Sequence, residues 1–174
     1  ASAHRGGFLV CASRARYDLC VSDPSVIPPR GRALEQAERE ALLADLEEMV
    51  GTSHLFKSLD DEGRRELIES GYVIHYAAGD VIMNEGDPGT KMFLVLTGKI
   101  SVETGGGDRG SIHLAELGRG ACVGEVSVLT GGVRTATVRA EVDAQLVAFE
   151  KHRIQRVIDA HPRVRKLLEA MIEG

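Results

Sequence analysis

The chain has 174 residues, of which 43% are hydrophobic and 27% charged, and its formal net charge at pH 7 is -5. Such a composition is typical of a globular protein and excludes a disordered one, and the length fits one domain, or one domain with an extension. The acidic balance argues against direct nucleic-acid binding, which needs a basic face, whereas a small anionic ligand needs only local positive charge. No apolar run approaches the roughly 18 residues of a membrane-spanning helix, so we predict no membrane span.

The cysteines are sparse and odd in number: Cys11, Cys20 and Cys122. They make no disulfide framework, and Cys11, Cys20 and His4 fit no metal-site spacing. We therefore expect free thiols, a reducing cytoplasmic location, no metal and no cofactor.

The N-terminal part of the chain is read as two segments. Residues 1–31, punctuated by Gly and Pro and with one candidate strand at Phe8–Cys11, are interpreted as an extension or the tail of a preceding domain. A helical period over 32–50, ended by Gly51, predicts a linker helix within residues 32–54.

The next segments predict a second helix and then strands. After the short connector "TSHLFKSL", residues 60–70 have acids in their first turn, where the helix dipole favours them. Beyond Gly71 the period drops to two, and glycine-rich turns separate seven short segments: 72–76, 80–84, 91–96, 99–104, 111–117, 134–141 and 144–150. This spacing indicates an antiparallel sandwich or barrel. Two C-terminal helices follow, over 151–160 and from Pro162 onward.

One segment, "GACVGEVSVLTGGVRTATVRA" (120–140), places the charges of Glu125 and Arg134 in a run of small and apolar residues. Buried charges are costly unless they are paired or bind a ligand. A short helical turn over 125–129 would point unpaired N–H groups at an anion. Gly124 lets the backbone come close to that anion, and Arg134 can bind it with two hydrogen bonds. Glu125 then accepts from a neutral hydroxyl or partners Arg134. This combination suits a sugar phosphate.

These motifs resemble those of cyclic nucleotide-binding domains. "GEVSVLTGGVRTATVRA" is similar to the phosphate-binding cassette of that family, and "AAGDVIMNEGDPGTKMFLVLTGKISV" is similar to its first strands and hairpin. The resemblance covers about residues 55–172. It implies a mainly β domain over 55–174, an antiparallel jelly-roll β-barrel with N-terminal helices and two C-terminal helices, whose ligand is cAMP or cGMP.

The resemblance also implies a role for each cassette residue. Glu125 would bind the ribose 2′-hydroxyl and Arg134 the cyclic phosphate, while Gly124 and Val126 would offer backbone N–H groups. Thr135 would lie against the phosphate and the base. A hydroxyl at this position favours cGMP in eukaryotic members, but bacterial cAMP binders also carry Ser or Thr there, so both nucleotides stay open, with cAMP first.

The segment departs from the family pattern at two positions, Val123 for an aromatic residue and Val133 for Pro. Both are expected to change the pocket wall without removing a ligand contact. The family's last helix can cover the base, which makes Leu167, Leu168 and Met171 candidates for a base lid.

No nucleophile–base pair, metal cluster or paired carboxylate stands out, so we expect a sensor and not an enzyme. Ligand binding would move the C-terminal helices and thereby regulate an attached or partner effector. The alternatives are a transcription regulator of the catabolite-activator type that lacks its DNA-binding part here, and a degenerate assembly module in which Glu125 and Arg134 form only a structural ion pair.

Overall fold

Two antiparallel β-sheets lie face to face in the computed structural model, which describes residues 31–45, 53–105, 110–162, 164 and 166. The first sheet has the spatial order β1 (Gly31–Ala33), β2 (Tyr72–Tyr76), β9 (Ala144–Glu150), β4 (Lys91–Thr97) and β7 (Cys122–Val123). The second has the order β3 (Val81–Met83), β8 (Thr137–Ala140), β5 (Ile100–Thr104) and β6 (Ile112–Leu117).

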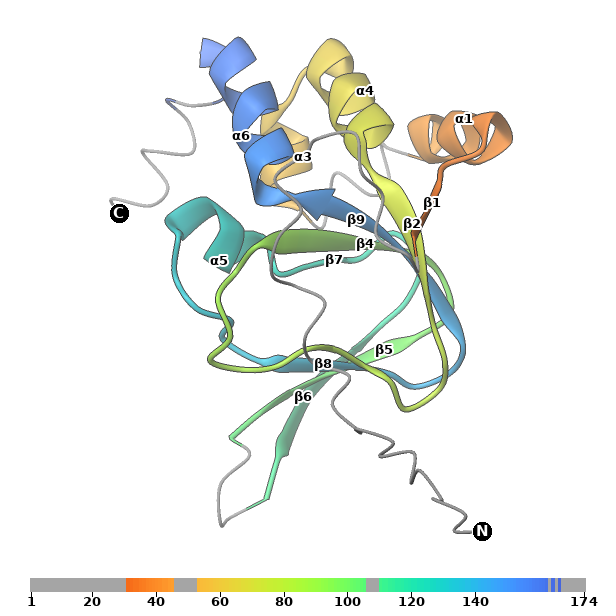
Figure 1. Ribbon diagram of the computed structural model, residues 1–174, viewed down its shortest axis with the longest axis vertical. Helices are drawn as coiled ribbons and strands as arrows, with labels where there is room; N and C mark the ends of the chain where they lie inside the picture. Colours follow the sequence, from red (N-terminus) through yellow and green to blue (C-terminus); the bar gives the residue numbers. More distant parts are fainter. Residues whose placement is uncertain (1–30, 46–52, 106–109, 163, 165, 167–174) are drawn as a thin grey trace, which may run out of the picture.

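Helices gather over the outer face of the five-stranded sheet (Figure 1). They are α1 (Gln36–Ala44), α3 (His54–Ser58), α4 (Asp61–Ser70) and α6 (Lys151–Ala160), while α5 (Glu125–Thr130) lies at one end of the sheets. The layers are therefore helices, five-stranded sheet and four-stranded sheet. The mainly β jelly-roll class predicted from the sequence is confirmed.

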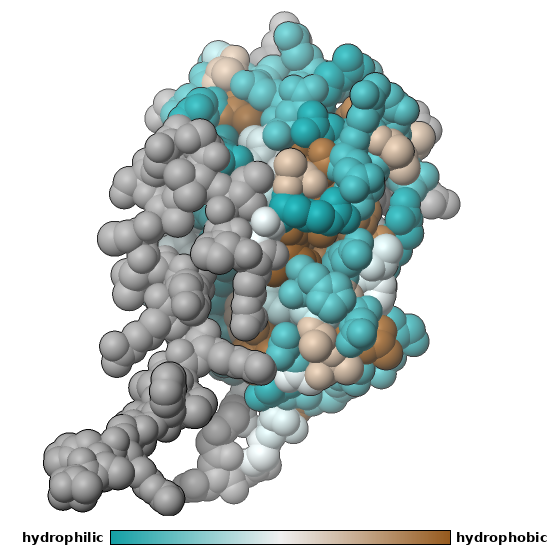
Figure 2. All heavy atoms as spheres, turned by 45° about the vertical axis from the view of Figure 1, so that its right-hand side comes forward, coloured by the Kyte–Doolittle hydropathy of each residue, from teal (hydrophilic) through white to brown (hydrophobic). Residues whose placement is uncertain are grey.

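The five-stranded sheet is buried on both faces, which explains the nearly unbroken apolar runs of β4 and β9. Met92 and Leu94 belong to the core cluster shared with the helices, whereas Phe93 and Val95 belong to the cluster between the two sheets. Alternate side chains of one strand thus serve two cores. On the surface, hydrophilic residues surround smaller apolar patches (Figure 2).

Barrel closure is the part of the fold prediction that was wrong, because the described strands form two separate sheets. The strand expected over 134–141 is shorter, because β8 begins only at Thr137. Ahead of it, the backbone of Arg134 exchanges hydrogen bonds with residues 86 and 87 of the loop between β3 and β4. Where the ladder would have continued, Pro88 and Val133 form a single isolated bridge.

The N-terminal elements also differ from expectation. Within the predicted helix 32–50, the described residues form β1, which pairs with β2, and then α1. The predicted connector contains α3, whose N-cap Ser53 accepts a hydrogen bond from the Phe56 N–H. The candidate strand at residues 8–11 and most of the last predicted helix lie outside the described residues, and the domain boundaries stay a prediction.

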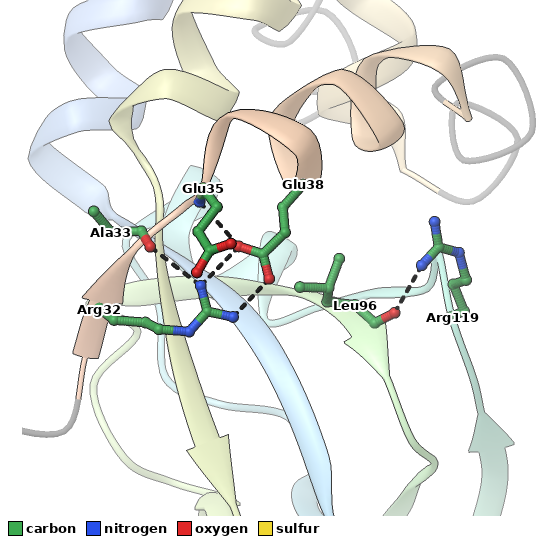
Figure 3. Close-up of polar contacts among 6 residues, drawn as sticks. All are labelled: Arg32, Ala33, Glu35, Glu38, Leu96 and Arg119. Atoms are coloured by element: carbon green, nitrogen blue, oxygen red, sulfur yellow. Dashed lines mark hydrogen bonds and ion pairs between the residues drawn. The ribbon is translucent and has the colours of Figure 1, made fainter.

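Helix α1 is tied to the strands at both ends (Figure 3). At its start, Arg32 of β1 donates to both carboxylate oxygens of Glu38, at 2.7 and 2.6 Å, and Glu38 also accepts from the Glu35 N–H at 3.0 Å. At its end, Arg119 donates to Asp45. Arg119 also donates to the Leu96 carbonyl at 3.1 Å, the contact drawn in Figure 3. These contacts make residues 31–45 part of the folded unit.

We predict a small, pH-dependent loss of stability for Glu38→Gln. The hydrogen bonds from Arg32 lower the pKa of Glu38, so the pair stabilises the fold above the carboxyl's ordinary pKa and is lost as pH falls through the lowered one. Because Arg32 is 43% exposed, the loss at pH 7 should stay below about 1 kcal/mol. Urea unfolding at pH 7 and pH 3 measures it.

The matched control is Glu116→Gln. The Oε2 atom of Glu116 lies 3.8 Å from Lys99 Nζ, and at 57% exposure this ion pair is expected to contribute little. That variant should unfold like the wild type at both pH values. An equal loss for Glu38→Gln at pH 7 and pH 3 would contradict the assigned role of the pair.

Candidate functional site

The chain between β7 and β8 carries the helical turn that the sequence predicts over 125–129. It is observed as α5, from Glu125 to Thr130. Gly124 precedes it in the left-handed conformation, with φ of 80°, and Gly131 ends it with φ of 74°. Glycine adopts this backbone conformation without strain, so the chain can turn sharply at both ends of the short helix.

Arg134 is buried, with 5% of its surface exposed, and its side chain reaches back to the start of α5. Nη1 donates to the Gly124 carbonyl and to Ser127 Oγ, both at 3.0 Å, and Nη2 donates to the Lys91 carbonyl at 2.5 Å. These carbonyl and hydroxyl oxygens orient the guanidinium but bring no negative charge to it. The arrangement fixes a cation between α5 and β4.

The loop before β4 is part of the same structure, which sequence reasoning did not foresee. The Gly86 N–H donates to the Arg134 carbonyl at 2.9 Å, and the Arg134 N–H donates to the Asp87 carbonyl at 2.8 Å. Gly89 packs so closely that a Cβ there would stand 2.5 Å from Ser127 Oγ. The sequence signal was the pair of glycines around Pro88, which we had assigned only to turns.

Glu125 has a partner on a different element. Its Oε1 accepts a hydrogen bond of 2.5 Å from the Leu55 N–H, in the first turn of α3. Arg134 thus contacts β4 and the start of α5, and Glu125 contacts α3. Leu55 carries no sequence signal for this contact, because its backbone makes it.

Cys122 lies beside Glu125 and is no candidate nucleophile. Burial raises the pKa of its thiol to about 12; the negative charge of Glu125 adds to the rise and a hydrogen bond with Ser53 opposes it. The thiol is therefore protonated at neutral pH, and a protonated thiol is a poor nucleophile.

The remaining predicted site residues are placed as follows. Val126 and Val133 are 61% and 57% exposed and Thr135 is exposed, so their side chains lie on the surface around the cassette. Val123 is 7% exposed and belongs to the core between the sheets. The lid candidates, residues 167, 168 and 171, lie outside the described part of the chain.

The described residues contain neither a metal-binding cluster nor a membrane-spanning helix. No group of three or more His, Cys, Asp or Glu side chains in that part could hold a metal ion. Within the same residues, no helix is long and apolar enough to cross a membrane.

Comparison with known proteins identifies relatives of several kinds. The family model for the cyclic nucleotide-binding domain matches residues 73–161. The chain is 26% identical over 131 residues to a cAMP-dependent protein kinase regulatory subunit of Blastocladiella emersonii, covering 75% of this chain and 32% of that protein. It is 38% identical over 99 residues to a cyclic nucleotide-gated cation channel protein of Drosophila melanogaster, covering 53% of this chain and 14% of the channel protein.

Among solved structures, the fold is similar to the N-terminal domain of a transcriptional regulator from Streptomyces coelicolor A3(2). The TM-score is 0.62 at 31% identity, over 72% of this chain and 89% of that one. The chain spans less than a third of the two curated relatives, 32% and 14% of their lengths. Since the family model matches more than half of its residues, the chain belongs to the cyclic nucleotide-binding domain family.

We predict that Gly124→Ala displaces Arg134. A Cβ at position 124 would overlap Arg134 Nη1 and stand 3.2 Å from Arg134 Cζ, and φ of 80° would be strained as well. The control, Gly79→Ala, shares the strain, with φ of 85°, but its Cβ would meet nothing within 4 Å. Strain alone costs about 1–3 kcal/mol, so the Gly124 variant should lose clearly more stability in urea unfolding than the Gly79 variant. Equal losses would show that Arg134 has room to move aside.

Proposed function

We propose that the chain is a cyclic nucleotide sensor domain, with Arg134 holding the cyclic phosphate and Glu125 the ribose hydroxyl. The observation that carries the proposal is the buried guanidinium of Arg134, which carbonyl and hydroxyl oxygens fix at the start of α5. A preoriented guanidinium binds a phosphate with charge-assisted, two-pronged hydrogen bonds.

Charge decides which way the ligand lies. The phosphate is attracted to Arg134 and repelled by the carboxylate of Glu125, which is expected to accept from a neutral hydroxyl. Gly124 directly precedes Glu125, and its carbonyl accepts a hydrogen bond from Arg134, so both binding groups contact the start of α5. The exposed side chains of Val126 and Thr135 are then available to the rest of the nucleotide.

The response to ligand is proposed to pass to the C-terminal helices. Arg134 donates to the Lys91 carbonyl, the neighbouring Thr90 carbonyl accepts from the Lys151 N–H at 2.9 Å, and Lys151 begins α6. A shift of Arg134 on binding phosphate can therefore be transmitted to α6 through one peptide bond and two hydrogen bonds. For regulation to follow, the nucleotide must bind the two helix positions with different affinity.

This role makes the chain a binding module and not an enzyme, acting on an attached or partner effector. Two relatives support that assignment, one named as the regulatory part of a protein kinase and the other as part of a cation channel. A cytoplasmic location is part of the proposal, since three cysteines without a disulfide framework suit a reducing compartment.

The second candidate function is transcription regulation. The likeness to the N-terminal domain of a transcriptional regulator, at 31% identity, favours it. In that case the effector is a DNA-binding part, and the cyclic nucleotide site acts in the same way. The two functions are distinguished by whether cyclic nucleotide changes the binding of the protein to DNA.

We predict that wild-type protein binds cAMP or cGMP and that Arg134→Ala weakens binding by about 30- to 150-fold, the scale of 2–3 kcal/mol for charge-assisted hydrogen bonds to phosphate. Titration calorimetry measures both nucleotides, below the melting temperature of the variant. Arg139→Ala is the matched control, because Arg139 lies on β8, is 44% exposed and pairs with Glu103 at 3.9 Å. It should bind like the wild type.

The same titration separates the alternatives. Wild-type protein that binds neither nucleotide would leave the degenerate assembly module as the function. Binding that Arg134→Ala leaves unchanged would overturn the phosphate assignment. The presence of Thr135 leaves both nucleotides open. The measured ratio of the two affinities would show which base is preferred.

A further inference from the structure

Helix α3 makes a backbone hydrogen bond to the side chain of Glu125. The Leu55 N–H donates to Glu125 Oε1 at 2.5 Å, although the two residues are 70 positions apart in the chain. Leu55 lies in the first turn of α3, where an N–H has no acceptor within the helix. Glu125 therefore completes the start of α3 from outside it.

The contact with the Leu55 N–H uses only one of the two carboxylate oxygens of Glu125. Within the described part of the chain, Glu125 Oε2 makes no hydrogen bond. A carboxylate has about four acceptor sites, so it can hold the Leu55 N–H and a ligand hydroxyl at the same time. A hydrogen bond to Oε1 restricts the rotation of the carboxylate and thereby fixes the direction in which Oε2 points.

Packing and hydrogen bonds hold α3 in place, so its Leu55 N–H can orient the carboxylate of Glu125. Leu55 and Phe56 are 0% and 1% exposed, and the Phe56 ring meets Phe149 of β9 edge-on at 5.9 Å. Arg64 of α4 donates to the Phe56 carbonyl at 2.9 Å. The N-cap Ser53 is 2% exposed and accepts from the Phe56 N–H at 3.3 Å.

We propose that the Leu55 N–H is a positioning group for the ribose-binding carboxylate of Glu125, so that the docking of α3 and nucleotide affinity strengthen each other. The inference rests on the proposed function, since it assigns the ribose hydroxyl to Glu125 Oε2. Coupling between two binding events is reciprocal: an ordered α3 raises affinity for the nucleotide, and bound nucleotide holds the Leu55 N–H more firmly.

The first test uses unaltered protein and amide hydrogen exchange of Leu55, followed by NMR with and without saturating cAMP or cGMP. Bound nucleotide should slow exchange of this amide by about fivefold or more. Faster exchange would mean that the ribose takes Glu125 away from α3, which would overturn the proposal. In ligand-free Glu125→Gln, the Leu55 amide proton should lose its downfield shift, because a neutral amide oxygen is the weaker acceptor.

The second test loosens α3 without touching a ligand group. Ser53→Ala removes the N-cap of α3 and should weaken nucleotide binding by about fivefold in calorimetry, whereas Ser53→Thr, which keeps the hydroxyl, should restore it. In a Glu125→Gln background, Ser53→Ala should change affinity by less than about twofold. An equal fivefold loss in both backgrounds would overturn the proposal.

Asp60→Ala is the matched control. Asp60 is the N-cap of α4 and accepts from the Gly63 N–H at 2.9 Å, so its loss should lower the melting temperature comparably and leave affinity within about twofold. Affinity unchanged in Ser53→Ala would overturn this inference while the proposed function stands. Wild-type protein that binds neither nucleotide would overturn both.

Discussion

The cassette depends on the burial of one cation, Arg134, whose side chain donates hydrogen bonds to oxygens of three other residues. A buried guanidinium is tolerated only when its N–H groups find acceptors, and the carbonyls of Gly124 and Lys91 and the hydroxyl of Ser127 are three of them. The glycine before α5 and the glycine at position 89 are both required by this arrangement. The first leaves room for the Arg134 side chain and the second for Ser127.

Glu125 extends the same cassette toward the N-terminal part of the chain. Its hydrogen bond to Leu55 makes α3 a neighbour of the site, and α3 in turn contacts α4 through Arg64 and β9 through Phe149. The helices over the outer face of the five-stranded sheet are therefore connected to the cassette on both sides, from Glu125 through α3 and from Arg134 through the start of α6. A ligand that touches both charged residues acts on both routes at once.

Much of this structure could be predicted from the sequence, because local signals agreed with tertiary packing. Period-two segments bounded by glycine turns located seven strands, and β2 and β9 were predicted to the residue. The short helix after Gly124 and the importance of Arg134 also followed from local sequence. Those features depend on residues whose chemistry is unusual for their surroundings, such as a charge in an apolar run.

The features that could not be predicted are made by backbone groups or by pairing between distant segments. Strand β1 exists because Gly31–Ala33 pairs with β2, which overrides the helical period that begins nearby. Glu125 contacts the backbone N–H of Leu55, and Arg134 contacts the backbone carbonyl of Lys91. Since nearly every residue carries these backbone groups, no pattern of side chains in the sequence predicts the two contacts. Gly124 illustrates the difference. The sequence indicated that its missing side chain admits a ligand, whereas in the structure the guanidinium of Arg134 fills that space. The requirement for glycine at position 124 is therefore set by a contact inside the protein.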